Sequence, residues 1–250
     1  LTNVFTDVDN NDSAITKVVE SNSNSSLVSA SISGNTLTLD YQADQNGSAT
    51  ITIRGTSNGL TVDDSFTVTV TAVNDAPTAT AQSVTGNEDV SQTITLAGID
   101  LDGDSLTYSI ATPPTHGSAS LSGNTVTYTP NSNYNGLDSF TFKVSDGTST
   151  SSEAPVSVTV SAVNDAPTLV SIGNQSASEG QAFSLVLSGS DVDGDGLTYT
   201  VSGNPSGSLL SGPTFSWTPG LSSSGLFTVT FTVDDGKGGT ASETITISVG

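Results

Sequence analysis

Apolar and polar residues alternate along many short segments of this chain. Val126 and Tyr128 are separated and flanked by threonines, and the segments 140–144 and 227–233 alternate in the same way. A period of two predicts β-strands that bury one face against a core and expose the other. No segment of helical period competes with this pattern, so the sequence predicts an all-β fold.

Two segments recur at a spacing of about 90 residues. Residues 72–78 (AVNDAPT) return unchanged as residues 162–168, and the segment 33–39 has counterparts at 122–128 and 211–217. Recurrence at a fixed period indicates homologous units in series. We therefore expect three units, over residues 1–73, 74–163 and 164–250.

Short strands, turns rich in Gly, Asn and Ser, and about 90 residues per unit are typical of an immunoglobulin-like sandwich. We expect three tandem antiparallel β-sandwiches of immunoglobulin or cadherin type, arranged in a rod. The first unit lacks the strand that opens the other two, so we expect residues 1–73 to be an N-terminally incomplete repeat of a longer chain. Donation of that strand by another chain is the alternative.

The charge is strongly acidic, with 25 Asp and Glu against 4 Lys and Arg and a net charge of −21. Nucleic-acid binding requires a basic surface, which this composition excludes. The absence of cysteine excludes disulfides and thiolate metal sites. No apolar run approaches the roughly 18 residues that cross a bilayer, so we expect no membrane insertion.

The acidic residues recur at matching places in the units. They stand in an Asp-rich loop of each unit, in Asn-Asp pairs of the linkers, in a Glu after the first strand, and in Asp-Gly after the penultimate strand. We take as candidate metal ligands Asp7, Asp9, Asn74, Asp75, Glu88, Asp100, Asp102, Asp104, Asp146, Asn164, Asp165, Asp191, Asp193, Asp195 and Asp235, with Asp12 beside the first pair.

Strand geometry predicts that these groups meet at the linkers. From Pro77 to Glu88 an extended chain covers about 36 Å at roughly 3.3 Å per residue, which carries Glu88 to the far end of its unit. The next strand returns and delivers Asp100 and Asp102 to the near end, and the penultimate strand delivers Asp146 there. By the same reasoning, Glu88 of one unit meets the acidic loop of the next.

Several carboxylates close together require a cation, and calcium accepts six to eight oxygen ligands at flexible angles. Magnesium demands a tighter octahedron, and zinc prefers nitrogen and sulfur. A single Asp-Gly is more often an ordinary turn than a ligand, whereas recurrence of the whole set favours calcium. An EF-hand is excluded because Ala111 and Ser202 stand where its bidentate Glu should be.

Two positions depart from the set. The first unit has Asn58-Gly59 where Asp-Gly is expected and has no counterpart of Glu88, so its own near-end site lacks these groups. Glu179 matches Glu88 in the third unit, and we expect it to contribute little without a following unit.

The motifs VNDAP (163–167), DVDGDGLTY (191–199) and YNGLDSF (134–140) resemble bacterial cadherin-like and immunoglobulin-like repeats of large surface adhesins, including RTX adhesins. The resemblance covers about residues 74–250 well and the first unit more loosely. It implies calcium-binding extender modules, outside the cell or at its surface, that hold a ligand-binding head away from the cell. The implied partners are neighbouring repeats, and other copies of the fibre or surface glycans.

Other functions fit the sequence less well. His116 is the single histidine and stands in a predicted turn, and the carboxylates recur unit by unit, so we expect no enzymatic activity. Trp217 invites a carbohydrate-binding interpretation, but it occupies the alternation position of Tyr128 and Leu39 and is predicted to be a core residue. A carbohydrate-binding accessory module and a strand-donating filament subunit remain the alternatives.

Overall fold

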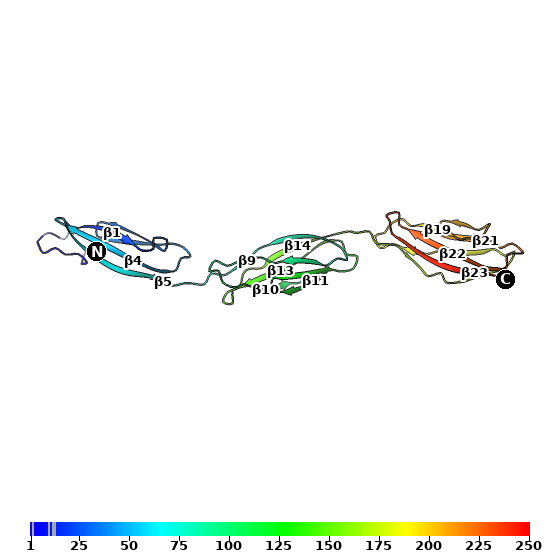
Figure 1. Ribbon diagram of the computed structural model, residues 1–250, viewed down its shortest axis with the longest axis horizontal. Coiled ribbons are helices and arrows are strands. Elements are labelled where there is room, and N and C mark those ends of the chain that lie inside the picture. Colours follow the sequence, from blue (N-terminus) through cyan, green and yellow to red (C-terminus); the bar gives the residue numbers. More distant parts are fainter. Residues whose placement is uncertain (2, 10, 12–13) are drawn as a thin grey trace. The chain divides into compact units, whose positions relative to one another are not determined.

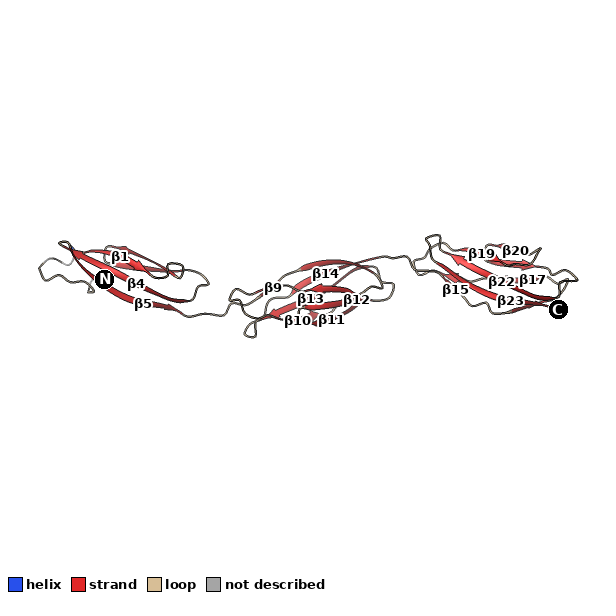
Figure 2. Cartoon of the chain, viewed as in Figure 1, coloured by secondary structure: helices blue, strands red, loops and turns tan. Residues whose placement is uncertain are grey.

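The computed structural model describes residue 1, residues 3–9, residue 11 and residues 14–250. Every element of this part of the chain is a β-strand, as the red arrows of Figure 2 show. No helix that could cross a membrane is present among these residues. The predicted all-β fold of tandem immunoglobulin- or cadherin-like sandwiches is confirmed.

The described residues of the first sandwich form five strands in two sheets, of which Figure 1 labels β1, β4 and β5. The sheets have the orders β1-β4-β5 and β2-β3. The strands are β1 (Thr16–Asn22), β2 (Val28–Ser33), β3 (Thr36–Tyr41), β4 (Gly47–Ser57) and β5 (Leu60–Val70). Phe5 and Ile15, which precede β1, complete its core together with Leu27, Ile51 and Ile53.

The second sandwich repeats this arrangement with more strands. Its sheets have the orders β10-β13-β14-β7, β11-β12-β8 and β6-β9. The strands are β6 (Thr78–Ala79), β7 (Gln82–Asn87), β8 (Gln92–Thr95), β9 (Gly98–Ile99), β10 (Thr107–Thr112), β11 (Gly117–Ser122), β12 (Thr125–Pro130), β13 (Gly136–Ser145) and β14 (Ala154–Ser161).

The third sandwich has the same topology as the second. Its sheets have the orders β16-β23-β22-β19, β17-β21-β20 and β15-β18. The strands are β15 (Thr168–Leu169), β16 (Gln175–Ala177), β17 (Phe183–Val186), β18 (Gly189–Ser190), β19 (Thr198–Ser202), β20 (Leu209–Ser211), β21 (Thr214–Trp217), β22 (Gly225–Asp234) and β23 (Thr240–Val249).

One pair of strands in each of these two sandwiches is parallel, which refines the expected antiparallel arrangement. β7 runs parallel to β14, and β16 runs parallel to β23. The opening segment first pairs antiparallel, as β6 with β9 and β15 with β18, and then crosses to the opposite sheet. The first sandwich has no such strand among its described residues, so the outer edge of β5 is unpaired there.

The alternation of the sequence corresponds to the core. Val126, Tyr128, Phe140 and Phe142 are all at most 1% exposed. Trp217 is 4% exposed and packs in the third core, as predicted. These buried side chains supply the apolar area that stabilises each sandwich.

The chain divides into two compact units. The first contains Leu1–Ala81, Leu96–Ala111 and Thr141–Ala154. The second contains Gln82–Thr95, Thr112–Phe140 and Pro155–Gly250. Each acidic group described below lies within one of these units.

A buried carboxylate organises the second sandwich. Asp138 is only 7% exposed, and its oxygens accept hydrogen bonds from the Tyr128 hydroxyl at 2.9 Å and from the backbone N–H of Ser139 at 2.8 Å. The backbone N–H groups of Thr115 and His116 also donate to it, at 3.1 and 3.0 Å. Burial alone would raise the pKa of Asp138, but these hydrogen bonds hold the pKa below its ordinary value.

The three sandwiches fill this position differently. Tyr128 and Asp138 correspond to Trp217 and Phe227, whose rings meet edge to face with centroids 4.9 Å apart. In the first sandwich the matching residues are Leu39 and Ala49, which belong to one apolar cluster. A hydrogen-bonded pair in one repeat is therefore replaced by an apolar pair in the others, so that neither Tyr128 nor Asp138 loses its partner to an apolar residue within the same repeat.

We predict that Asp138→Ala lowers the free energy of unfolding by about 3 kcal/mol, because the Tyr128 hydroxyl and buried amides lose their acceptor. Tyr128→Phe should cost about 1 kcal/mol, since it removes one donor only. The folded pKa of Asp138 is lowered, so its contribution is complete above the unfolded value of about 3.9 and is lost as pH falls through the folded pKa. Urea unfolding at neutral and acidic pH checks this, and equal midpoints at pH 7 would contradict it.

Candidate metal centres

Two acidic loops follow the short strands β9 and β18. In the first acidic loop (residues 100–104), Asp100 Oδ1 accepts the backbone N–H groups of Asp102 at 3.0 Å and Asp104 at 3.2 Å. Gly103 has a φ of 81°, a conformation that suits glycine. The turn places the three carboxylates so that one oxygen of each lies within 4.8 Å of the others.

The second acidic loop (residues 191–195) has the same construction. Asp191 Oδ1 accepts the backbone N–H groups of Asp193 at 2.9 Å and Asp195 at 3.2 Å. Its three carboxylates also bring one oxygen each within 4.8 Å of the others. The spacing Asp-x-Asp-Gly-Asp therefore specifies the same loop twice.

Each linker is tied to the loop that follows it. We call residues 71–77 the first linker and residues 162–167 the second. The backbone N–H of Asp75 donates to Asp102 Oδ2 at 2.7 Å, and that of Asp165 donates to Asp193 Oδ2 at 2.8 Å. These bonds bring the carboxylates of Asp75 and Asp165 beside loops that are already acidic.

Glu88 meets the second linker. It follows β7 directly, is 2% exposed, and its Oε1 accepts the backbone N–H of Val163 at 2.7 Å. One oxygen each of Glu88, Asp165 and Asp193 lie within 4.8 Å of one another. The structure thus joins the end of β7 to the loop after β18, the juxtaposition expected from strand lengths.

Several carboxylate oxygens in these groups are buried without a donor. In the described part of the chain they are Asp100 Oδ2, Asp165 Oδ2, Asp191 Oδ2 and Asp195 Oδ2. A buried anionic oxygen without a hydrogen bond or cation is energetically costly. These oxygens therefore fit a hard cation that takes oxygen ligands, and calcium has the flexible geometry for such a set.

The surroundings of Asp75 and Asp165 in the two linkers disfavour the charged form of their carboxylates. Burial, followed by the negative charges of Asp89 and Asp193, raises the pKa of Asp165. Burial and the charges of Asp102 and Asp44 raise the pKa of Asp75 in the same way. Both shifts have the sign expected where like charges gather without a counter-ion.

The carboxylates of Asp146 and Asp235, by contrast, accept hydrogen bonds from backbone N–H groups of their own loops. Asp146 Oδ1 accepts the backbone N–H groups of Thr148 and Ser149 at 2.6 Å each, and Asp235 Oδ1 accepts those of Lys237 and Gly239 at 2.7 and 3.0 Å. A Cβ at Gly239 would collide with the Asp235 carboxylate, which explains the glycine.

The linker asparagines bind these same two carboxylates. Asn74 Nδ2 donates to Asp146 Oδ2 at 2.9 Å, and Asn164 Nδ2 donates to Asp235 Oδ2 at 2.8 Å. The pKa of Asp146 is lowered chiefly by the Ser149 N–H and that of Asp235 chiefly by Asn164. These two bonds hold each linker against the hairpin loop that contains the aspartate. Asp146 and Asp235 lie outside the three acidic groups of the described residues. That Asn74, Asn164, Asp146 and Asp235 are metal ligands stays a prediction.

The first sandwich carries a partial version of the acidic loop. The backbone N–H of Asp9 donates to Asp7 Oδ1 at 2.9 Å, as in the two complete loops, but Ser57 Oγ donates to Asp7 Oδ2 at 2.6 Å. Asp12 lies outside the described residues. Asn58 and Gly59, with φ of 48° and 78°, form a two-residue turn between β4 and β5, so no acidic hairpin loop forms there.

Sequence reasoning missed two acidic residues at the linkers, Asp44 and Asp89. Asp44 lies before β4 with a φ of 56° and lines a cleft of about 370 Å³ with Asp75 and Asp102. Asp89 Oδ1 accepts the backbone N–H of Asn133 at 3.0 Å, and its charge raises the pKa of Asp165. Asp44 matches Asn133 at the repeat spacing, and this alignment of turn residues was the signal available.

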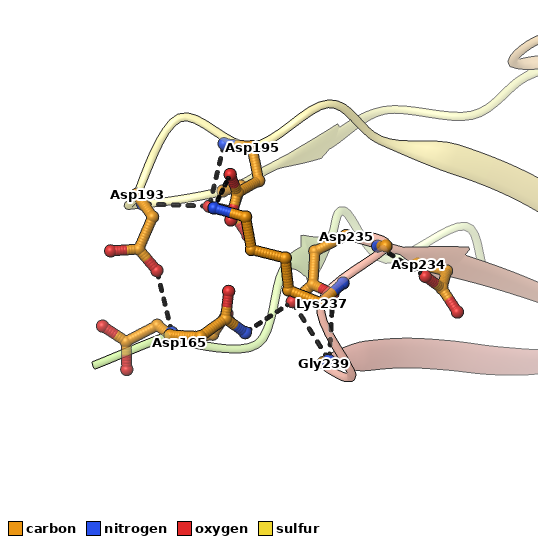
Figure 3. Close-up of polar contacts among 10 residues, drawn as sticks. Asp165, Asp193, Asp195, Asp234, Asp235, Lys237 and Gly239 are labelled. Atoms are coloured by element: carbon orange, nitrogen blue, oxygen red, sulfur yellow. Dashed lines mark hydrogen bonds and ion pairs between the residues drawn. The ribbon is translucent and has the colours of Figure 1, made fainter. Parts of the chain in front are cut away.

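A lysine was also missed. Figure 3 shows the Lys237 side chain extending from the loop between β22 and β23 to the second acidic loop, where Nζ lies 2.6 Å from Asp195 Oδ1. The hydrogen bond to Asp195, with the charges of Asp195, Asp193 and Asp191, raises the pKa of Lys237. Glu179 lies elsewhere in the third sandwich, where its Oε1 accepts the backbone N–H of Ser224 at 2.9 Å.

Comparison with known proteins identifies relatives of this arrangement. The profile of the family described as "Bacterial Ig domain" matches residues 74–159 and again residues 164–248. "Integrin beta-like protein A" of Dictyostelium discoideum is 30% identical over 151 residues, which are 52% of this chain and 8% of that protein. This chain thus spans only a small part of the curated relative.

Solved structures with a similar fold include cadherin ectodomains. The structure titled "PcdhgB3 EC1-4" has a TM-score of 0.53 at 14% identity, over 95% of this chain and 67% of that chain. The "Protocadherin GammaB4 extracellular domain" has a TM-score of 0.51 at 17% identity, over 95% of this chain and 45% of that chain. At such identities the likeness concerns the fold.

We predict that two substitutions of an aspartate by an uncharged asparagine shift the unfolding midpoint of the metal-free protein in opposite directions. Asp165→Asn should raise the unfolding midpoint, since the raised pKa means that its charge destabilises the folded state at pH 7. Asp235→Asn should lower it, because the lowered pKa means that its charge is stabilised by folding. Thermal melts in chelator check both signs, and a fall in both variants would contradict the electrostatic interpretation.

Proposed function

The chain belongs to the Bacterial Ig domain family, and from this premise we propose that its sandwiches are calcium-stiffened extender repeats of a bacterial extracellular adhesin or surface fibre. The proposed role is structural, in adhesion. The proposed repeats cover residues 1–73, 74–163 and 164–250, with the linkers at their boundaries.

The observation that carries the proposal is the group formed by Glu88, Asp165 and Asp193. Glu88 belongs to one sandwich, Asp193 to the next, and Asp165 to the linker between them. Buried oxygens without donors in Asp165 and in the adjoining loop add to the demand for a cation. A cation bound here would connect two sandwiches through side chains that otherwise repel one another.

Bound at this linker, calcium would supply two positive charges and accept six to eight oxygen ligands. Glu88, Asp165 and the second acidic loop would hold it. At the first linker the corresponding ligands are Asp75 and the first acidic loop, with Asp44 in place of a glutamate. Asn74, Asn164, Asp146 and Asp235 would keep the linkers in position against the loops.

Duplication of the acidic group supports a structural rather than a catalytic role. The loops 100–104 and 191–195 share their hydrogen-bond pattern, and each adjoins a linker. A site that recurs with the repeat serves each junction, whereas an active site needs one special location. We propose that the partners are calcium, neighbouring repeats of the same protein, and other copies of the fibre or surface glycans.

The carbohydrate-binding alternative requires exposed aromatic rings. Trp217 is 4% exposed and meets Phe227 edge to face inside the third sandwich. Its ring is therefore part of the core, which favours the extender over the accessory module.

The unpaired edge of β5 favours a second candidate, a subunit that accepts a strand from another chain. Leu60 and Val62 on β5 are 79% and 58% exposed, and within the described residues no strand covers this edge. A parallel strand in the place of β7 or β16 would complete the sheet. Sedimentation velocity tests this, since concentration-dependent association that Val62→Lys abolishes would support strand exchange, and a monomer at all concentrations would reject it.

For the extender, we predict that calcium raises the unfolding midpoint and that chelator lowers it. With a Kd of about 10⁻⁴ to 10⁻³ M, as in extracellular modules, 10 mM calcium would stabilise each site by about 1.4–2.7 kcal/mol. Glu88→Gln should remove most of this gain at the second linker. The measurement is a thermal melt of each protein with calcium and with chelator.

Glu179→Gln is the matched control, because Glu179 has the same place in the third sandwich but its Oε1 accepts the backbone N–H of Ser224 and it belongs to none of the three acidic groups of the described residues. Its calcium-induced shift should equal that of the wild type. Small-angle scattering adds a second readout, since calcium should narrow the distribution of interatomic distances by restricting the linkers. Coincident melts of the wild type with and without calcium would sink the proposal.

A further inference from the structure

The two acidic loops are internal duplicates, and the second has a tethered cation beside it. Both carry Asp-x-Asp-Gly-Asp with the same backbone-to-carboxylate hydrogen bonds. Among the described residues, only the second loop has an ammonium group against it, with Lys237 Nζ 2.6 Å from Asp195 Oδ1. At the repeat spacing of 89 residues, the matching residue in the second sandwich is Thr148.

Lys237 is positioned from both ends. Its backbone N–H donates to Asp235 Oδ1 at 2.7 Å, which fixes the start of the side chain in the loop between β22 and β23. Its Nζ reaches Asp195 (Figure 3). The Asp195 side chain is 14% exposed, whereas the Lys237 side chain is 59% exposed. The lysine therefore brings its charge to the loop from the solvent side.

The ion pair neutralises only part of the negative charge of the second acidic loop. Lys237 contacts Asp195 Oδ1, but Asp195 Oδ2 and Asp191 Oδ2 stay buried without a donor. One positive charge thus faces three carboxylates of the loop and the nearby Asp165. The same oxygens are those that a divalent cation would use.

The first acidic loop has no equivalent cation among its described neighbours. Thr148 uses its backbone N–H to bind Asp146 Oδ1 at 2.6 Å and carries no charge. Lys143, the nearest lysine in the sequence, pairs with Glu153 at 3.3 Å instead. The first linker has Asp44 where the second has Glu88, and the two also differ in the tethered ammonium, which can be exchanged at positions 148 and 237 without touching either acidic residue.

We propose that Lys237 is a built-in competitor for the divalent cation at the second linker, lowering its cation affinity while partly neutralising the loop when no cation is bound. The inference rests on the proposed function of this site. As a consequence, calcium should bind the second linker more weakly, and stabilise it less, than it would if residue 237 were uncharged. In a water-like dielectric, a unit charge about 5 Å from a divalent ion changes the affinity by about tenfold.

The test is a calcium titration of the full chain followed by NMR, with the amide signals of Gly103 and Gly194 reporting the first and second loops separately. Lys237→Thr should lower the midpoint at Gly194 by about tenfold and leave that at Gly103 unchanged. Thr148→Lys should raise the midpoint at Gly103. In chelator, Lys237→Thr should also lower the unfolding midpoint, because the loop loses its internal counter-ion.

Two controls separate the charge from other effects. Lys237→Arg keeps the charge and should keep the Gly194 midpoint within about twofold, and Lys17→Thr removes a lysine that binds Asn35 and should move neither signal. A Lys237→Arg midpoint equal to that of Lys237→Thr would overturn the inference. So would unchanged Gly194 midpoints in Lys237→Thr.

These failures differ from failure of the proposed function. If calcium shifts neither Gly103 nor Gly194 in the wild type at millimolar concentration, the calcium-binding role itself is wrong, and the competitor proposal falls with it. If calcium shifts both signals but Lys237→Thr titrates like the wild type, the extender proposal stands and only the role of Lys237 is rejected.

Discussion

Repulsion among carboxylates at the linkers is the constraint on which the rest of the structure depends. Backbone hydrogen bonds from Asp75 and Asp165 hold the linkers against loops that are already acidic, and burial removes the water that would weaken the repulsion. Part of this repulsion is offset within the protein, because asparagines donate hydrogen bonds to Asp146 and Asp235 and a lysine forms an ion pair with Asp195. The remaining repulsion involves buried carboxylate oxygens that have no hydrogen-bond donor, and a bound cation would relieve it.

Much of the fold was predictable from the sequence because its signals are local. Alternation predicts the buried faces of β12 and β13, and the repeat spacing places Trp217 at a core position, where it is buried. The parallel pairs β7–β14 and β16–β23 could not be predicted, since alternation specifies which face is buried and not the direction of the neighbouring strand. Extended length, however, was enough to bring Glu88 to the second linker.

The site was predictable in outline and less so in its division of roles. Spacing identified the acidic residues, but whether a carboxylate is free or saturated depends on the conformation of its loop. Asp235 is bound by two backbone N–H groups of its own loop, whereas Asp165 Oδ2 has no donor. Asp44 and Lys237 were missed because each acts on a group distant in the sequence, through a turn or a long side chain.

The parallel pairing of β7 with β14 has a mechanical consequence. The chain enters the second sandwich through the two-residue strand β6, continues into β7 and leaves just after β14, and β7 and β14 are joined along six residue pairs from Gln82–Val156 to Asn87–Ser161. Tension applied through the linkers pulls these neighbouring strands in opposite directions along their length. The hydrogen bonds between them are then loaded in shear and must break together, whereas a hairpin pulled at its open end would unzip one bond at a time.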